Sequence, residues 1–497
     1  MKRSTTPSFI QNFEIMESLD SGFREILASQ NAGKRLHNAL LGQKLGAVKA
    51  AKKIEAWKNA RKLPQGSRER AQAFSLICES YGLTESQTEK DATGLKNRCE
   101  DIKRSIGAHV CQKIASRVWI AVEKLLHGKS KRVRFKKKRD AYSIEGKNND
   151  TGLRLLGAED GTPYFLFRNK RYALKCDLTN AYHKHALDHR VKFVRLLKRH
   201  INCKDTYFVQ VLFEGLPFRD VAKEERHKKR TLERFGQDYF TKLEEIDDAV
   251  RAVVCIDMGP RHIAISNCLV SWERNIALEL KNHSDWLKKA QRLQDRSKRA
   301  SNPKNYGAKG RPLRGKKWVF SKNYLKRQRQ IQNYYRKKQE YRKSIQGFLV
   351  HEVLTHGNII KLEKVSYKSF QRNFGKSVGD HGPASLIDKL TRRAIMAGGR
   401  TEKINTFQTK LSQTCLCGNQ KKKSLSQRVH NCELCGFVSP RDTVSAFLGI
   451  FTHNSEVEVH NKKTRVESEL NLEEARKWIS GHRTLSEAWS KTKTQSV

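Results

Sequence analysis

Two short apolar runs that each end in an acidic residue are the feature that most constrains the fold. Ala252-Val-Val-Cys-Ile256 precedes Asp257, and Asn358-Ile-Ile-Lys-Leu362 precedes Glu363. Runs of this length and apolar character predict buried strands, and residues 261–266 (RHIAIS) predict a hairpin partner for the first one. If the two strands are neighbours in one sheet, their carboxylates converge and need cations between them. We therefore expect a divalent metal site at the end of these strands.

A third acid, Asp442, lies near the start of a predicted helix. It follows Ser439-Pro440-Arg441, and the apolar residues after it would pack this helix on the sheet: Val444, Ala446, Phe447 and Ile450. In two-metal phosphodiester hydrolysis, carboxylates hold ions ~3.5–4 Å apart, one activating water and the other stabilising the leaving oxygen. Any one of these acids could instead be a turn or helix-cap residue. The order Asp257, Glu363, Asp442 favours a catalytic set that binds two Mg²⁺ ions.

The eleven cysteines divide into seven that are scattered singly and four that cluster. Cys415, Cys417, Cys432 and Cys435 form two knuckles whose loop can close on one tetrahedral Zn²⁺. The first knuckle has one intervening residue where two are usual, which leaves His430 open as a substitute ligand for Cys417. We expect this zinc to be structural. The pattern is not a disulfide framework, so it indicates a reducing compartment.

The charge balance indicates a polyanionic partner. Lys and Arg number 100 against 51 for Asp and Glu, a formal charge of +49 that nucleic acid would neutralise. The run Lys129–Arg139 could line a strand that faces phosphate, or it could be a solvated charged face. A second basic stretch, the loop Gly307–Lys317, joins predicted helices at roughly 283–298 and 321–353. The candidate nucleic-acid-binding residues in the two stretches are Lys131, Arg132, Arg134, Lys136, Arg311, Arg314 and Lys316.

A membrane or secreted location is not expected. Apolar stretches such as Val118–Leu126 are broken by charge well short of the ~18 residues that a membrane span needs. The first residues, MKRSTTPSFIQNFEIME, lack the apolar segment of a secretory signal. The sequence therefore predicts a cytoplasmic protein, associated with the nucleoid of a bacterium or archaeon.

The periodicity of apolar residues changes along the chain. Residues 20 to about 127 predict a helical bundle, with apolar side chains every four positions and turn signals at 64–67 and 81–85. From about 128 to 215 the period becomes two, and aromatic and β-branched residues dominate, which is typical of a β-domain. The charge-dense residues 221–248 predict a linker helix.

Several further motifs, together with the order of the acids and cysteines, resemble one family. They are Phe374-Gly-Lys-Ser-Val-Gly379, the Ala397-Gly-Gly399 turn, Leu411-Ser-Gln-Thr-Cys415 and Leu425-Ser-Gln-Arg428. A strand-end Asp, a basic insertion, a strand-end Glu, two cysteine knuckles and an Arg-Asp pair opening the last core helix resemble the TnpB family and the related compact type V CRISPR effector nucleases. The similarity is specific over about 250 to 452, and before 250 it extends to the architecture alone.

The resemblance implies an RNA-guided DNA endonuclease with an α+β multidomain fold. It implies a helical recognition bundle (1–127), a β-barrel wedge or oligonucleotide-binding domain (128–220), a linker helix (221–250), an RNase H-like RuvC core with a basic helical insertion (251–410 and 437–497), and a zinc-ribbon insertion (411–436). Asp257, Glu363 and Asp442 would be the catalytic acids, and the cysteines would belong to a zinc element beside them. The implied partners are guide RNA and target DNA, and the protein could act as a monomer or as a homodimer.

Two positions near the acids leave questions open. Val444 stands where many members of the family have Asn, although Ser445-Ala-Phe-Leu448 suits one of its branches. Arg441, beside the third acid, could contact the scissile phosphate or could be an ordinary surface arginine.

Three other classes of protein are weighed against this interpretation. Cut-and-paste transposases also carry three acids on an RNase H fold, but usually in the order Asp, Asp, Glu. An RNA-guided DNA-binding protein or transposon-associated factor would bind without cutting, and the presence of all three acids argues against it. A plain RNA-binding protein would explain the charge, but neither the acids nor the cysteine knuckles.

Overall fold

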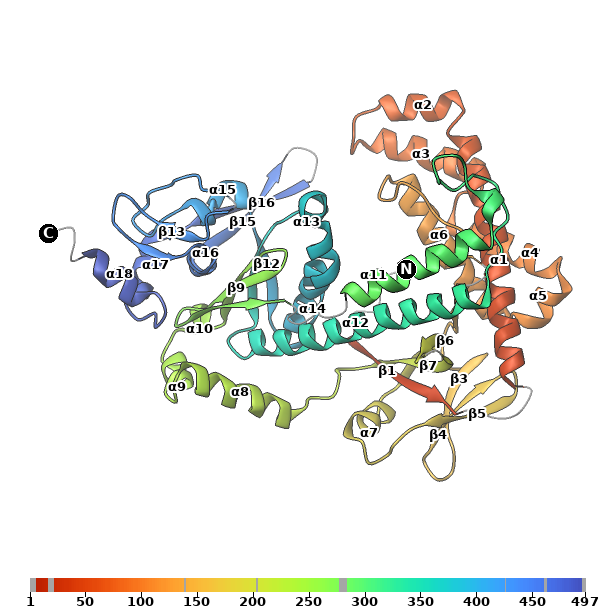
Figure 1. Ribbon diagram of the computed structural model, residues 1–497, viewed down its shortest axis with the longest axis horizontal. Coiled ribbons are helices and arrows are strands. Elements are labelled where there is room, and N and C mark those ends of the chain that lie inside the picture. Colours follow the sequence, from red (N-terminus) through yellow and green to blue (C-terminus); the bar gives the residue numbers. More distant parts are fainter. Residues whose placement is uncertain are drawn as a thin grey trace. The chain divides into compact units, whose positions relative to one another are not determined.

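The computed structural model describes residues 6–16, 22–137, 140–202, 204–276, 284–424, 426–459 and 463–493. The chain divides into two compact units, Met1–Arg219 and Asp220–Val497 (Figure 1). Cys203, Leu425, Lys138 and Arg139, which the sequence motifs include, lie outside the described residues.

The first unit contains a helical layer that follows the predicted four-residue periodicity. Buried apolar side chains of α6 recur at Val110, Ile114, Val118 and Val122 and form part of one core. The predicted turns are confirmed, because the side chains of Ser67 and Thr84 cap the helices that follow them. The helices of this layer are α1 (Gly22–Ala51), α2 (Glu55–Lys62), α3 (Arg68–Ser80), α4 (Glu85–Asn97), α5 (Glu100–Ser105) and α6 (Ala108–Leu126).

The same unit contains a seven-stranded antiparallel sheet in the order β2-β6-β7-β1-β5-β4-β3. Edge strand β3 also contacts β6, so the sheet curls back into a half-barrel. The strands are β1 (Ser8–Ile15), β2 (Ile144–Glu145), β3 (Leu153–Gly157), β4 (Pro163–Phe167), β5 (Lys170–Lys175), β6 (Val191–Ile201) and β7 (Lys204–Glu214), with the short helix α7 (Ala181–Leu187) before β6.

Two features of this sheet differ from the sequence interpretation. Strand β1 precedes the residues predicted to be helical but lies within 1–127, the range that the resemblance assigns to a helical bundle; it pairs with β7 and buries Phe13 and Ile15 in the core. The basic run, which could have lined a strand or formed a solvated charged face, is irregular over residues 131–137, and its basic side chains there are exposed. The side chain of Asn38 accepts a hydrogen bond from the backbone N–H of Lys136 and donates one to its carbonyl, both at 2.8 Å, so that this backbone bonds to a side chain in place of a strand ladder.

The second unit is built on a five-stranded sheet in the order β10-β9-β8-β11-β12. The predicted hairpin is confirmed, since β8 pairs antiparallel with β9, and the third predicted strand, β11, pairs parallel with β8. The strands are β8 (Val253–Met258), β9 (His262–Ser266), β10 (Ser271–Asn275), β11 (Ile359–Glu363) and β12 (Arg400–Ile404).

Both faces of this sheet are covered, which explains the unbroken apolar runs that first marked its strands. Val254, Ile256 and Leu362 pack with residues of α12 (Lys322–Leu354) and α14 (Pro383–Met396). Val253 and Cys255 point to the opposite face and pack with α16 (Arg441–Ile450). Asp257 and Glu363 therefore follow strand residues that alternate between two buried layers.

The remaining elements of the second unit surround this sheet. Residues 221–250, expected to form one linker helix, form three short ones, because Gly236 ends the first at a φ of 102° that favours glycine. The elements are α8 (Val221–Phe235), α9 (Tyr239–Glu244), α10 (Asp248–Arg251), α11 (Ser284–Ala300), α13 (Tyr367–His381), α15 (Thr406–Thr409), α17 (Leu472–Ile479), α18 (Ser486–Lys493), the hairpins β13 (Val429–Asn431)–β14 (Val438–Pro440) and β15 (Thr452–Val459)–β16 (Lys463–Leu470), and the turns η2 (Pro303–Asn305) and η3 (Leu411–Gln413).

Across the described ranges of both units, the helices are all too short or too polar to cross a bilayer.

Candidate active site and cysteine cluster

The register of β8 and β11 places two of the predicted acids side by side. These parallel strands pair residue by residue up to Ile256 with Leu362. Asp257 and Glu363 are the next residues on each strand, at the carboxyl-terminal edge of the sheet. Because side chains alternate along a strand, Asp257 shares the face of Cys255, which is the face that α16 covers.

Helix α16, which packs on one face of the sheet, supplies the third acid at the same edge. Asp442 is its second residue, and nine of the ten residues of the helix are buried. The helix packs so closely on β8 that a side chain at Gly449 would collide with the Sγ atom of Cys255. Close packing over the whole length of α16 therefore fixes the position of Asp442 in the first turn.

A buried lysine fixes the other end of α16. The Nζ atom of Lys361, on β11, donates to the carbonyl oxygens of Ile450 at 2.6 Å and Thr452 at 2.7 Å. The carbonyl of Ile450 is the last of the helix, where carbonyls have no partner within the helix and carry partial negative charge, so the ammonium group stabilises it. The carbonyl of Thr452 belongs to the first residue of β15, so the same lysine also holds the start of that strand. The strand that carries Glu363 thus also holds the helix that carries Asp442.

The three carboxyl groups influence one another electrostatically. Burial, followed by the charges of Glu363 and Asp442, raises the pKa of Asp257 well above its usual value. Burial and the charge of Asp442 raise the pKa of Glu363 to about 7. Such effects require short separations in a partly dehydrated site. The fold therefore brings together the three acids that the sequence singled out, at a site where their negative charges repel.

Asp442 has two arginine partners. Arg441 donates to its Oδ1 atom from Nε at 3.0 Å and from Nη2 at 2.9 Å, and Arg428 donates to Oδ2 from Nη1 at 3.3 Å. Arg441 also donates to the carbonyl oxygens of Ser424 and Gln427. Only 8% of Arg441 is exposed, which excludes the alternative of an ordinary surface arginine. It joins the loop at 424–428 to the start of α16.

Two neighbours of the acids, Glu273 and Arg428, were not singled out as site residues from the sequence. Glu273 on β10 lies across Ala264 from Asp257 in the strand register, so it shares the same face of the sheet. It accepts a hydrogen bond at 3.0 Å from the hydroxyl of Thr443, next to Asp442. Of these neighbours, Arg428 alone carried a sequence signal, because it ends one of the family-like motifs.

The acids suit hard divalent cations. Carboxylate oxygens are the preferred ligands of Mg²⁺, and a cation would stabilise two partly buried carboxylates whose pKa is raised by burial and by neighbouring acids. Over the ranges that the structure describes, the cysteines are the one group of three or more His, Cys, Asp and Glu residues whose ligand atoms all lie within 4.8 Å. Among the described residues, the three acids do not form such a group.

The four predicted cysteines form a compact cluster. Their Sγ atoms all lie within 4.8 Å of one another, with Cys415 and Cys435 3.6 Å apart and Cys417 and Cys432 also 3.6 Å apart. Gly418 and Gly436, which follow the two knuckles, adopt φ angles of 95° and 71° and turn the chain back. The short first knuckle thus still delivers Cys417 to the cluster, which could hold a tetrahedral metal ion.

His430 is outside this cluster. Its Nδ1 atom lies 2.5 Å from the Nζ atom of Lys423, and burial followed by the charge of that lysine lowers its pKa to about 4. Within the cluster, burial opposes ionisation of Cys432, but the N–H groups of Cys435 and Leu434 and the side chain of Asn419 lower its pKa to about 6. A thiolate at neutral pH is the form that binds metal.

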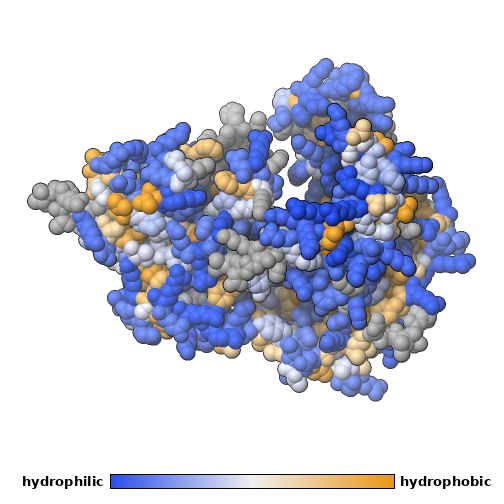
Figure 2. Space-filling view, viewed as in Figure 1, coloured by the Kyte–Doolittle hydropathy of each residue, from blue (hydrophilic) through white to orange (hydrophobic). Residues whose placement is uncertain are grey.

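The candidate nucleic-acid-binding residues lie on exposed segments, apart from Arg441. Lys131, Arg132, Arg134 and Lys136 are exposed on the irregular segment of the first unit, and Arg311, Arg314 and Lys316 are exposed on the loop between α11 and α12. Side chains of Asn302 and Asn305 hold this loop by bonds of 2.7 Å to the carbonyls of Val319 and Lys317. Hydrophilic residues cover most of the face drawn in Figure 2.

A comparison with known protein families gives a match within the second unit. Residues 384–448, which include α14, β12, the cysteine cluster and Asp442, match the family model described as Cas12f1-like, TNB domain. This match confirms the resemblance to compact type V effectors of the Cas12f and TnpB kind.

Among solved structures, the chain is similar to one titled "Cryo-EM structure of the Cas12f1-sgRNA-target DNA complex". The two are 13% identical in sequence, the TM-score is 0.44, and the match covers 90% of this chain and 98% of the other. The search of curated proteins gives no match.

Proposed function

We propose that this protein is an RNA-guided endonuclease that cuts target DNA by metal-dependent phosphodiester hydrolysis. The observation that carries the proposal is the convergence of Asp257, Glu363 and Asp442 at one edge of the five-stranded sheet. Three acids from three separate elements, placed where their charges repel, lower the stability of the fold. Such groupings are typical of functional sites.

The topology around the acids supports an RNase H-like core of the RuvC type. Strands β10, β9 and β8 form an antiparallel meander, β11 and β12 continue the sheet parallel to β8, and α16 covers one face. In this proposal residues 251–410 and 437–497 are the nuclease core, 411–436 is a zinc ribbon, 221–250 links the core to the preceding residues, 128–220 is the wedge domain, and 1–127 is the recognition bundle.

The chain's own residues have distinct tasks in the proposed reaction. Asp257, Glu363 and Asp442 would hold two Mg²⁺ ions, which when bound supply charge stabilisation at the scissile phosphate and lower the pKa of water. Arg441 holds the Asp442 carboxylate through two N–H groups and thereby orients it. Arg428, whose side chain is largely exposed, places a positive charge where a DNA phosphate could bind.

The cysteine cluster would hold one structural Zn²⁺ through Cys415, Cys417, Cys432 and Cys435. The match of residues 384–448 to a Cas12f1-like TNB domain supports a guide RNA and a DNA target as partners. The net charge of +49 supports backbone contacts along a nucleic acid, while base pairing to a guide would read the sequence.

The test is cleavage by protein purified with its co-expressed RNA. DNA that matches the RNA should be cut in Mg²⁺, and the Asp257→Ala variant should bind the same RNA and DNA without cutting. If Asp257→Ala cuts as well as the wild type, the acids are not the active site. If the wild type binds matching DNA but leaves it intact, the alternative of an RNA-guided binder or transposon-associated factor holds.

A further inference from the structure

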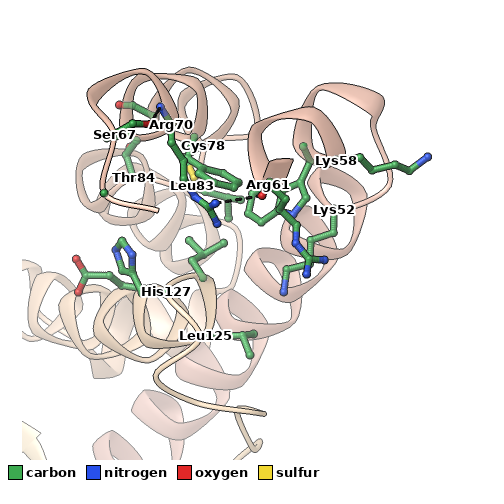
Figure 3. Close-up of a pocket in the computed structure, with 18 of the residues that line it drawn as sticks. Lys52, Lys58, Arg61, Ser67, Arg70, Cys78, Leu83, Thr84, Leu125 and His127 are labelled. Carbon is green, nitrogen blue, oxygen red and sulfur yellow. Dashed lines mark hydrogen bonds between the residues drawn. The ribbon is translucent and has the colours of Figure 1, made fainter. Parts of the chain in front are cut away.

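The helical layer of the first unit forms a large cavity, open to the surface, that the proposed nuclease site does not use. Its volume is about 1280 Å³, and its walls come from α2, α3, the start of α4 and the end of α6 (Figure 3). Small-molecule sites usually occupy roughly 300–1,000 Å³, so this cavity is large enough for a short stretch of a polymer.

One wall of the cavity is aromatic and apolar. The rings of Trp57 and Phe74 meet edge to face with their centroids 4.8 Å apart, and Phe74 and Trp119 are partly exposed. The guanidinium carbon of Arg70 lies 5.6 Å from the centre of the Phe74 ring, and its Nη1 atom donates to the carbonyls of Arg61 and Leu63. Hydrogen bonds thus hold a flat cation beside an accessible ring.

The rim of the cavity is strongly basic. Lys52, Lys58, Arg61 and Lys62 are exposed there, and the acids of the lining are Glu85 and Glu123. Figure 3 shows Lys58 pointing outward, and it forms an ion pair with Glu55 at 2.9 Å. A second copy of this chain, itself carrying a charge of +49, would be repelled by such a rim, whereas a polyanion would be attracted.

We infer that this cavity binds unpaired nucleotides of a nucleic acid strand, an inference that rests on the proposed function as a nucleic-acid-binding effector. Bases would stack on Phe74 and Trp119, and phosphates would contact Lys52 and Arg61. Aromatic platforms beside cations are the arrangement by which proteins hold single strands without reading sequence. The lining ends at Gly128, directly before the exposed basic residues 131–137, so the strand has a positively charged exit along the chain.

The experiment uses the full-length protein freed of bound RNA at high salt, with short oligonucleotides that carry 4-thiouridine or 4-thiothymidine. Ultraviolet cross-links are mapped to peptides by mass spectrometry. We expect single strands to label peptides that contain Phe74 or Trp119. The Trp119→Ala variant should need roughly tenfold more oligonucleotide to label the Phe74 peptide, since stacking contributes about that factor per base.

Two lysine variants control for misfolding, because each removes a single exposed positive charge. Lys52→Ala, on the rim, should weaken labelling, whereas Lys53→Ala, an exposed neighbour outside the lining, should not. Labelling by RNA alone, DNA alone or both supports the inference and identifies the strand. Labelling by duplex alone, the absence of cross-links within residues 52–128, or equal losses in the two lysine variants would overturn it.

The same preparations separate this inference from the proposed function. Asp257→Ala should lose cleavage and keep the cavity cross-links. If the wild type cross-links in the cavity but never cuts matching DNA, the proposed cleavage fails and the nucleotide site stands.

Discussion

The acid site and the cysteine cluster lie in the same unit, but the chain assembles them in opposite ways. The cysteines come from two tight turns within residues 415–435, and their sulfurs close to within 4.8 Å. The acids come from two strands and a helix that are far apart in the sequence, and they meet only because β8, β11 and α16 pack together. The cysteines pack in the same core as α16 and could hold a metal ion, whereas the acid site needs strands and a helix from distant parts of the chain.

The two sites also differ in how charge is handled. In the cysteine cluster, burial raises the pKa of Cys415 and raises that of Cys435 to about 11, whereas hydrogen bonds from N–H groups overcome burial at Cys432 and lower its pKa to about 6. At the acid site, burial and neighbouring charges raise the pKa of Asp257 and Glu363, which makes the carboxylates costly to ionise. At the acid site both strand-end carboxyl groups have raised pKa values, and shifts of this kind are common at functional sites.

The largest expected effect is on cleavage, and it distinguishes the three proposed catalytic acids from Glu273, which lies on the same face of the sheet. Asp442→Asn should reduce cleavage of guided DNA by roughly 10³-fold or more, because several kcal/mol of charge stabilisation is lost. Glu273→Gln, on the same face of the sheet but hydrogen-bonded to Thr443, should change the cleavage rate by less than about tenfold. Single-turnover cleavage measures both, and equal losses would extend the catalytic set to Glu273.

The next effect concerns the cysteines. Cys432→Ser should lower bound zinc from about one equivalent to well under half, and the loss should destabilise the surrounding segment by several kcal/mol. Metal analysis and thermal unfolding report the two quantities. Asp257→Ala is the matched control and should keep its zinc. Full zinc in Cys432→Ser would mean that His430 or another group replaces this ligand.

A smaller effect follows from the pKa of Glu363, which is raised from 4.5 to about 7. Because the folded chain favours the protonated carboxyl, its stability falls as pH rises through this range, so Glu363→Gln should be more stable than wild type by about 3 kcal/mol near pH 8 in Mg²⁺-free buffer. The difference should vanish below about pH 4.5. Denaturant titrations across pH test this, and a difference independent of pH would contradict the electrostatic origin.

The smallest expected effect concerns the buried lysine that joins the strand of Glu363 to the end of α16. Lys361→Met keeps most of the packing but leaves the carbonyls of Ile450 and Thr452 without their donor, at a cost of about 1–3 kcal/mol. The midpoint of unfolding should fall, while cleavage at low temperature should fall far less than in Asp442→Asn. A loss of cleavage as large as that of Asp442→Asn would place Lys361 in the chemistry.

Local patterns predicted much of this architecture. The apolar runs before Asp257 and Glu363 predicted β8 and β11, and the knuckle spacing predicted the cysteine cluster, because both signals are contained in a few consecutive residues. The convergence of the acids could be predicted only as a possibility, because acids that end two neighbouring strands lie at the same edge when the strands are parallel, as β8 and β11 are.

What the sequence did not predict depends on contacts between distant segments. The role of Lys361 arises from the end of α16, and the burial of Arg441 arises from the loop at 424–428. The basic run at 131–137 has the alternation of a strand, but Asn38 bonds the backbone of Lys136 that a neighbouring strand would otherwise pair. Local propensity gives way where tertiary hydrogen bonds are available.

Strand β1 has a consequence for how the first unit can be made. It lies in the interior of the half-barrel sheet, between β5 and β7, although it is the first strand of the chain. During synthesis, β1 has no partner in the sheet until the whole helical layer and then β5 and β7 have been made. Contacts so distant in sequence form slowly. We therefore expect the helical layer to fold on the ribosome first, with closure of the sheet as the late, slow step of this unit.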